Sequence, residues 1–167
     1  SGGDPLFLPD KKLFSIIDSL SSSVPTIRIH TRSPIFYPQR VQAQFLAELQ
    51  KRRNIWLIVH INHEQELSED VLDVLAKIRD TGTPILNQTV LLKGVNDDVD
   101  ALANLCTKLI SIGVFPYYLH HTDRVQGASQ FFVSLEDGVM LYRELRKRIS
   151  GIALPRYVID PEDGSGK

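Results

Sequence analysis

The sequence is poor in the residues and patterns that mark several common classes of protein. Its 167 residues include one cysteine, Cys106, so no disulfide can form within the chain and a reducing, cytoplasmic setting is expected. No apolar run approaches the roughly 20 residues that span a bilayer. A formal net charge of -1 offers no excess of positive charge for nucleic acid or an anionic membrane. These absences predict a soluble cytoplasmic protein whose partner is a small molecule.

Sequence motifs of common enzyme classes are also absent. The chain has neither the dinucleotide fingerprint GxGxxG nor the phosphate loop GxxxxGK[ST], and it has no GxSxG nucleophile elbow. Cys106 lies in the helical run ALANLCTKLI, which predicts a core residue. The chain begins Ser1-Gly2-Gly3, without methionine or a secretory signal, and this favours a piece of a longer protein.

What the chain does contain is a regular alternation of two patterns. Short apolar, β-branched or aromatic runs recur about every 30 residues, the length of a βα unit, and segments with helical periodicity lie between them. Strands are expected at residues 26–32, 55–62, 85–92, 115–123 and 152–160. Helices are expected at residues 10–20, 38–52, 68–81, 97–112 and 134–149. The alternation predicts an α/β fold with a parallel sheet and right-handed crossovers.

Polar side chains gather where these expected strands end. They are His30, Thr31, Arg32, His60, Asn62, His63, Asn87, Gln88, His120, His121, Asp123 and Asp160. Burying such groups without partners would cost about 1 to 3 kcal/mol each, so sheet packing alone does not explain them. In open α/β sheets and in barrels, ligands bind beyond the carboxyl ends of the strands. We therefore expect these side chains to face a common cavity.

A metal site is one interpretation of the histidines and Asp123. Adjacent residues of a strand point to opposite faces, which argues against His120 and His121 binding one ion. His60 and His63 also lack the i, i+4 spacing by which one helix face supplies two ligands. No metal site is predicted from these residues.

Several sequence blocks together resemble one enzyme family. The blocks are SGGDPL, IRIHTRSPIFYPQR, HINHEQEL, NQTVLLKGVND, PYYLHHTDRVQGA and SGIALPRYVID followed by GSGK. In this order and with these intervals they are similar to the lysine 2,3-aminomutase family of radical S-adenosylmethionine enzymes. The resemblance covers the whole chain. It implies the C-terminal part of an incomplete α/β barrel over residues 1–160 and a glycine-containing loop over residues 161–167.

The resemblance also implies a reaction and three cofactors. The family are isomerases that move the α-amino group of L-lysine to the β carbon, using a [4Fe-4S] cluster, S-adenosylmethionine and pyridoxal phosphate. The cluster needs a CxxxCxxC motif, which is expected before residue 1, so this chain alone is expected to be inactive. Two alternatives remain open. One is the branch that makes (R)-β-lysine for elongation factor P, and the other is a non-catalytic α/β module that binds a cationic amino acid.

Residues near the start of the chain match the family's S-adenosylmethionine site. Ser1, Gly2, Gly3 and Asp4 match a glycine-rich turn that holds the methionine moiety, and glycines permit the close backbone approach that this contact needs. His60 and Gln88 match two further positions that line the same cofactor pocket.

Residues near the ends of the last two strands match the sites of lysine and pyridoxal phosphate. Asp123 and Asp160 match the carboxylates that hold the side-chain ammonium of lysine, and a cation leaving water does need such compensating charge. Lys167 matches the lysine that forms a Schiff base with pyridoxal phosphate. The strands missing from an incomplete barrel would leave an open sheet edge, which favours a homo-oligomer.

Overall fold

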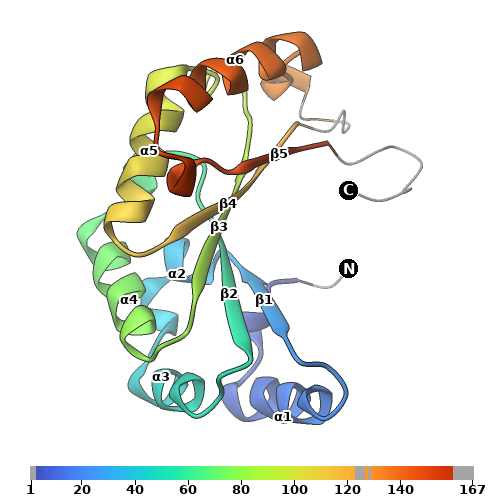
Figure 1. The fold of residues 1–167 in the computed structure, drawn as a ribbon. Coiled ribbons are helices and arrows are strands. Elements are labelled where there is room, and N and C mark those ends of the chain that lie inside the picture. Colours follow the sequence, from blue (N-terminus) through green and yellow to red (C-terminus); the bar gives the residue numbers. More distant parts are fainter. Residues whose placement is uncertain (1–2, 123–126, 128, 160–167) are drawn as a thin grey trace. The chain divides into compact units, whose positions relative to one another are not determined.

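The computed structural model of the protein describes residues 3–122, 127 and 129–159. Strands and helices alternate along this part of the chain (Figure 1). The strands are β1 (Ile27–Thr31), β2 (Ile55–His60), β3 (Ile85–Val90), β4 (Phe115–His120) and β5 (Arg156–Val158). They follow the order β1-β2-β3-β4-β5 in one sheet, and the pairs β1–β2 and β4–β5 are parallel. The predicted α/β class is confirmed.

The helices between the strands agree with the predicted periodicity in most places. They are α1 (Asp10–Ser21), α2 (Ser33–Phe36), α3 (Ala43–Gln50), α4 (Glu69–Asp80), α5 (Val99–Ser111) and α6 (Leu135–Arg148). Short 3₁₀ helices are found at Pro5–Phe7, Pro38–Arg40, Glu64–Glu66, Ser129–Phe131 and Gly151–Ala153. Within the described residues, no helix is both long and apolar enough to cross a membrane.

The strands expected to end at residues 62, 92 and 123 end at His60, Val90 and His120, and two predicted elements begin several residues too early. The helix expected from residue 38 begins at Ala43, because Gln42 has an extended backbone that separates it from the 3₁₀ turn Pro38–Arg40. The strand expected from residue 152 begins at Arg156. Residues Gly151–Ala153 form a 3₁₀ turn, and Pro155 has no amide hydrogen to donate to a sheet.

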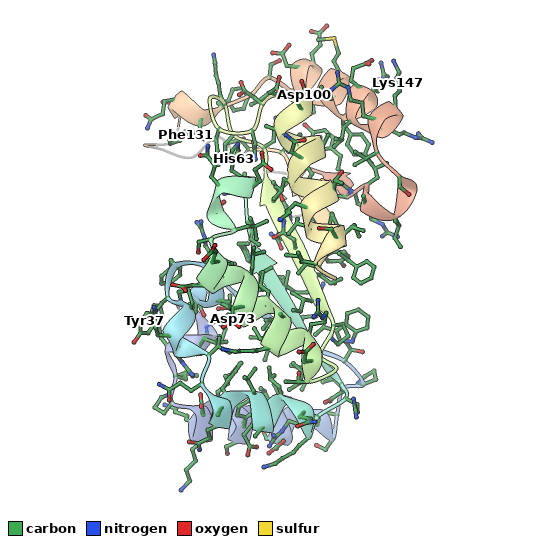
Figure 2. All side chains as sticks on the ribbon, turned by 90° about the vertical axis from the view of Figure 1, so that its left-hand side faces the viewer. Tyr37, His63, Asp73, Asp100, Phe131 and Lys147 are labelled. Carbon is green, nitrogen blue, oxygen red and sulfur yellow. The ribbon has the colours of Figure 1, made fainter. Side chains whose placement is uncertain are left out.

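Helix α4 has the termini that its sequence predicts. The Oγ atom of Ser68 accepts a hydrogen bond from the amide of Val71, and two acidic residues occupy the first turn. Asp73 lies on the exposed side of the helix (Figure 2), where its carboxylate pairs with Lys77 at 2.6 Å. Such exposed pairs contribute about 0.2 to 1 kcal/mol, so burial of the opposite face stabilises this helix more.

The chain divides into two compact units, and the first comprises Ser1–His60 and Glu66–Leu86. Its core includes the rings of Phe14 from α1 and Phe45 from α3, whose centroids lie 5.6 Å apart. The guanidinium of Arg52 covers Phe14 at 4.7 Å from the ring centroid and pairs with Asp18 and Glu48. The aromatic pair and the cation above it hold α1 against α3.

The second unit comprises Ile61–Gln65 and Asn87–Lys167. Helix α5 packs against β4 and α6, and the side chains between them form the core of this unit. Its buried members include Leu91, Leu102, Leu119, Val133 and Leu145. Cys106 is 3% exposed in α5, which confirms its prediction as a core residue. Burial raises the pKa of its thiol to about 12.

The loop after β3 is held by the side-chain amide of Asn96. Its Oδ1 atom accepts a hydrogen bond from the amide of Leu92 at 2.7 Å. Its Nδ2 atom donates to the carbonyls of Asn62 and Val90, at 2.8 and 2.9 Å. Asn96 is 1% exposed, so its side-chain amide is shielded from water and bonds these three backbone groups instead. This explains the second asparagine of the block NQTVLLKGVND, Asn96, as a structural residue.

In the first unit, the carboxylate of Asp4 ties the N-terminal segment to the end of β1. It accepts hydrogen bonds from the hydroxyl of Thr31 at 2.7 Å and from the amides of Leu6, Arg32 and Ser33 at 2.9, 2.7 and 3.2 Å. Partial burial alone would raise the pKa of Asp4. The hydrogen bonds from Thr31 and from the backbone outweigh this effect, and the net shift of the pKa is downward.

We predict that Asn96→Ala destabilises the protein by about 2 to 4 kcal/mol, because three partly buried backbone groups lose a hydrogen bond. Denaturant unfolding measures the change. Asn104→Ala is the control, since its exposed amide makes one long hydrogen bond, 3.5 Å, to Glu64. That control should change stability by no more than about 0.5 kcal/mol. Equal effects of the two substitutions would show that Asn96 does not hold the loop.

We predict that Asp4→Asn costs about 1 to 2 kcal/mol at neutral pH, a figure reduced for the partial exposure of the carboxylate. A carboxyl group whose pKa is lowered on folding stabilises the protein above its unfolded pKa. That contribution is lost as the pH falls from about 4 through the folded value, so the stability curves of wild type and variant should converge in acid. Asp80→Asn, in an exposed carboxylate, is the control. Parallel curves for wild type and Asp4→Asn would contradict the assignment.

Candidate functional site

Two of the four residues predicted to form the turn that holds S-adenosylmethionine, Gly3 and Asp4, are the first described residues of the first unit. Ser1 and Gly2 lie outside the described residues, while Gly3 is exposed, with open space where a Cβ atom would stand. Asp4 follows, with its carboxylate occupied by donors from Leu6 and from the end of β1. The hydrogen bonds of Asp4 therefore fix the start of the described chain to the end of β1, and the backbone at Gly3 remains accessible.

Two histidines meet at the ends of β1 and β2 in the same unit. The rings of His30 and His60 lie 5.9 Å apart, centroid to centroid, with an interplanar angle of 67°. Both side chains are partly exposed. The parallel register pairs Thr31 with Val59, which brings these strand ends together. His60 was predicted as a cofactor contact, and His30 is its neighbour in the structure, so the two rings form one polar aromatic surface.

Gln88 and Asn87 lie on opposite faces of β3, as alternation in a strand requires. Asn87 is 1% exposed, and its side-chain amide is bonded within the fold. It exchanges hydrogen bonds with the backbone of Ile61 at 2.9 and 3.0 Å and donates to the hydroxyl of Thr89 at 2.8 Å. The expectation that Asn87 faces a ligand cavity is thus wrong. Its side chain bonds the amide and the carbonyl of Ile61, just after β2, where a neighbouring strand residue would otherwise bond them.

The side chain of Gln88 has a different environment. Its Oε1 atom is buried and accepts no hydrogen bond from any described residue. A buried amide oxygen without a donor costs about 1 to 3 kcal/mol, and such atoms often mark a place where a ligand or water donates. This observation suits the predicted role of Gln88 as a cofactor contact.

The residues predicted to bind lysine and pyridoxal phosphate, Asp123, Asp160 and Lys167, lie outside the described residues. The strands that lead to the two aspartates are neighbours. β4 and β5 are parallel with His120 opposite Val158, and the amide of His121 donates to the carbonyl of Val158 at 2.8 Å.

His120 and His121 have separate surroundings at the end of β4. His120 is 6% exposed and contacts Tyr118 edge to face, with ring centroids 5.5 Å apart. The Nδ1 atom of His121 lies 2.7 Å from the hydroxyl of Tyr157. The sequence predicted that both histidines face one cavity. It did not indicate a role for Tyr157, which lies in an apolar run without a distinguishing motif.

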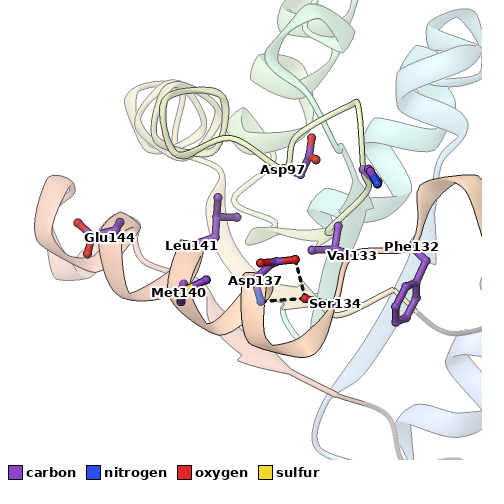
Figure 3. A pocket seen from close by; sticks show the side chains of 9 residues that line it. Asp97, Phe132, Val133, Ser134, Asp137, Met140, Leu141 and Glu144 are labelled. Atoms are coloured by element: carbon purple, nitrogen blue, oxygen red, sulfur yellow. Dashed lines mark hydrogen bonds between the residues drawn. The ribbon is translucent and has the colours of Figure 1, made fainter.

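A pocket of about 560 Å³ opens beside α6 in the second unit (Figure 3). Lys93, Asp97, Phe132, Val133, Ser134, Asp137, Met140, Leu141 and Glu144 line it. Its carboxylates already have structural partners. Asp97 accepts from the amide of Gly94 at 2.8 Å, and Asp137 accepts from the hydroxyl of its helix cap, Ser134, at 2.6 Å. None of the residues predicted as ligand contacts lines this pocket.

Curated relatives match the whole chain or nearly all of it. Proteins named L-lysine 2,3-aminomutase from Fusobacterium nucleatum and Methanococcus maripaludis are 39% and 41% identical over 100% of this chain. The protein of that name from Escherichia coli is 42% identical over 93% of this chain. The matched regions make up 40%, 39% and 46% of those proteins, so the chain spans less than half the length of these relatives.

Solved structures share the fold at low sequence identity. A domain of pyruvate-formate lyase-activating enzyme from Bacteroides vulgatus has a TM-score of 0.61 and 17% identity, with 96% of both chains covered. SuiB of Streptococcus suis bound to S-adenosylmethionine has a TM-score of 0.64 and 10% identity, over 96% of this chain and 38% of SuiB. A radical SAM methyltransferase from Sphaerobacter thermophilus has a TM-score of 0.53 and 18% identity, over 80% and 40% of the two chains.

No protein-family profile matches the chain. The assignment depends instead on the long alignments with individual proteins, which extend through all the sequence blocks quoted above. They confirm the resemblance: over its whole length this chain is a relative of the L-lysine 2,3-aminomutases, and it shares its fold with the activating-enzyme domain and with the radical SAM methyltransferase.

Proposed function

We propose that this chain is the C-terminal part of a radical S-adenosylmethionine, pyridoxal phosphate-dependent aminomutase that moves the α-amino group of L-lysine to the β carbon. The observation that carries the proposal is 39% to 42% identity, along nearly the whole chain, to proteins named L-lysine 2,3-aminomutase. Since the chain spans less than half of those relatives, the activity belongs to the complete polypeptide that contains it. The one cysteine, buried in α5, cannot supply the three thiolates of a cluster site, so the chain alone does not turn over.

The turn Ser1 to Asp4, His60 and Gln88 are the proposed contacts to S-adenosylmethionine. Asp4 fixes the turn through its hydrogen bonds to the end of β1, and the exposed backbone at Gly3 allows close approach of the methionine moiety. The buried Oε1 atom of Gln88 can accept a hydrogen bond from the ligand. When bound, S-adenosylmethionine and the cluster supply the radical chemistry, and these residues supply binding and orientation.

Asp123 and Asp160 are the proposed partners of the substrate ammonium. Each follows one of two adjacent parallel strands, three residues after His120 in the first case and two after Val158 in the second, and those two residues are opposite in the sheet register. Two carboxylates on neighbouring chain segments can compensate a cation that leaves water and give it charge-assisted hydrogen bonds. Lysine fits this charge, whereas an acidic amino acid would be repelled.

Lys167 is the proposed anchor of pyridoxal phosphate. Its amine can condense with the aldehyde of the cofactor, and glycines on its N-terminal side, Gly164 and Gly166, allow the backbone to adapt when a substrate amine displaces it. A non-catalytic module that binds a cationic amino acid would have no use for such an anchor. Formation of β-lysine from lysine by the complete polypeptide, measured by NMR or by chromatographic separation of the two isomers, separates the two functions.

We predict that Lys167→Ala in the complete polypeptide abolishes the visible absorbance of pyridoxal phosphate bound to a lysine amine, because no other group of the site replaces that amine. Absorbance spectra before and after borohydride reduction provide the measurement. Lys93→Ala, which removes an exposed lysine outside the proposed site, serves as the matched control and should keep the wild-type spectrum. A wild-type spectrum in Lys167→Ala would sink this assignment.

We predict that Asp123→Asn and Asp160→Asn each raise the KM for lysine about 10- to 100-fold, since a charge-assisted hydrogen bond becomes a neutral one. Steady-state kinetics of the complete polypeptide would measure the effect. Asp73→Asn, on the exposed side of α4, is the control and should leave KM unchanged. An unchanged KM in both site variants would remove these carboxylates from the lysine site.

A further inference from the structure

The ends of β4 and β5 are joined by two hydrogen bonds of different kinds. The amide of His121 donates to the carbonyl of Val158 at 2.8 Å. The Nδ1 atom of the same histidine lies 2.7 Å from the hydroxyl of the preceding residue on β5, Tyr157, with the rings edge to face at 84°. His121, the residue that follows β4, thus contacts two successive residues of β5, through its backbone and through its side chain.

Tyr157 is itself held rigidly. Its ring stacks on Tyr142 of α6, with centroids 5.4 Å apart and planes 19° apart, and the hydroxyl of Tyr142 donates to the carbonyl of Pro155 at 2.9 Å. Gly138, one turn earlier in α6, leaves the space that the phenol occupies. A Cβ atom at Gly138 would stand 2.0 Å from the hydroxyl oxygen of Tyr157. A glycine inside a helix is unfavourable, and here the close approach of the phenol explains it.

The imidazole of His121 is held on a second side by Phe132, edge to face at 5.9 Å and 83°. Partial burial raises the pKa of Tyr157 to about 12, so the phenol keeps its proton at neutral pH and can donate to an imidazole nitrogen. The His121 ring therefore has a defined orientation, set by an aromatic contact on one side and a hydrogen bond on the other.

We propose that Tyr157 and His121 form a positioning pair for the lysine site. The chain reaches Asp123 two residues after His121 and Asp160 three residues after Tyr157, so the pair couples the two segments that carry the proposed carboxylates. This inference rests on the proposed function, because it is in that proposal that Asp123 and Asp160 bind lysine. The pair does not touch the reacting atoms, and its effect is on binding of the substrate ammonium.

The test measures lysine kinetics of the complete polypeptide with Tyr157→Phe, which removes the hydroxyl and keeps the ring stack. We expect KM for lysine to rise about 3- to 10-fold, the effect of one neutral hydrogen bond, with kcat changed less than about 2-fold. Tyr117→Phe is the matched control, since it deletes a tyrosine hydroxyl that donates only to the neighbouring Tyr118. It should leave both constants unchanged. Thermal unfolding of every variant confirms that the fold is kept.

A second variant disturbs the hydrogen bond between Tyr157 and His121 without removing either of its two groups. Gly138→Ala places a methyl group where the Tyr157 hydroxyl stands and should push the phenol away from His121. We expect the same rise in KM. Nitrogen NMR of the His121 imidazole is the independent readout, and both Tyr157→Phe and Gly138→Ala should shift the Nδ1 resonance while Tyr117→Phe does not.

The outcomes separate this inference from the proposed function. If Asp123→Asn and Asp160→Asn raise KM while Tyr157→Phe and Gly138→Ala do not, the positioning role is overturned and the lysine site stands. If neither the aspartate variants nor the pair variants change KM, the lysine site fails and the positioning role fails with it. A KM effect of Tyr157→Phe with an unaltered His121 resonance would also overturn the coupling between the two residues.

Discussion

Parallel strands end with peptide groups that have no further strand residue to bond with, and the rest of this structure depends on side chains that satisfy them. Asn96 and Asn87 do this in the second unit, where their amides bond the backbone at Asn62, Ile61 and Leu92. Asp4 does the same in the first unit for the amides that follow β1. Because unpaired buried peptide groups are so costly, these few side chains determine the course of the chain where ligands bind in folds of this kind.

The same constraint divides the polar residues at the strand ends into two groups. The amide of Asn96 bonds three backbone groups, and that of Asn87 bonds the backbone of Ile61 and the hydroxyl of Thr89, so both amides are engaged within the fold. The buried Oε1 atom of Gln88, in contrast, accepts no hydrogen bond from the residues that the structure describes. Gln88 is thus the residue of β3 with an acceptor left for a ligand, while the two asparagines belong to the frame around it.

Much of the fold could be predicted because its signals are local. The stripe and cap of α4, with Ser68 before two acids, and the 30-residue spacing of the strands follow from periodicity and dipole arguments. The start of α3 could not be predicted, since the helical pattern of the sequence runs through Gln42, whose backbone is extended in the structure. The distinction between Asn87 and Gln88 also escaped prediction, although strand alternation does place them on opposite faces. Asn87 is bonded within the fold by Ile61, which is distant in sequence, and by Thr89, which no motif marks. The Tyr157–Gly138 contact joins residues 19 positions apart by shape alone, and no sequence pattern indicates it.

Cys106 has a chemical consequence for work with this protein. Its thiol is buried in α5 and remains protonated far above neutral pH, so it is a poor nucleophile and a poor ligand for iron. Alkylating reagents and peroxide, which react with thiolates, should therefore leave Cys106 of the folded chain unmodified. In a larger polypeptide with further cysteines, thiol labelling would report on those cysteines, with a silent background from this part of the molecule.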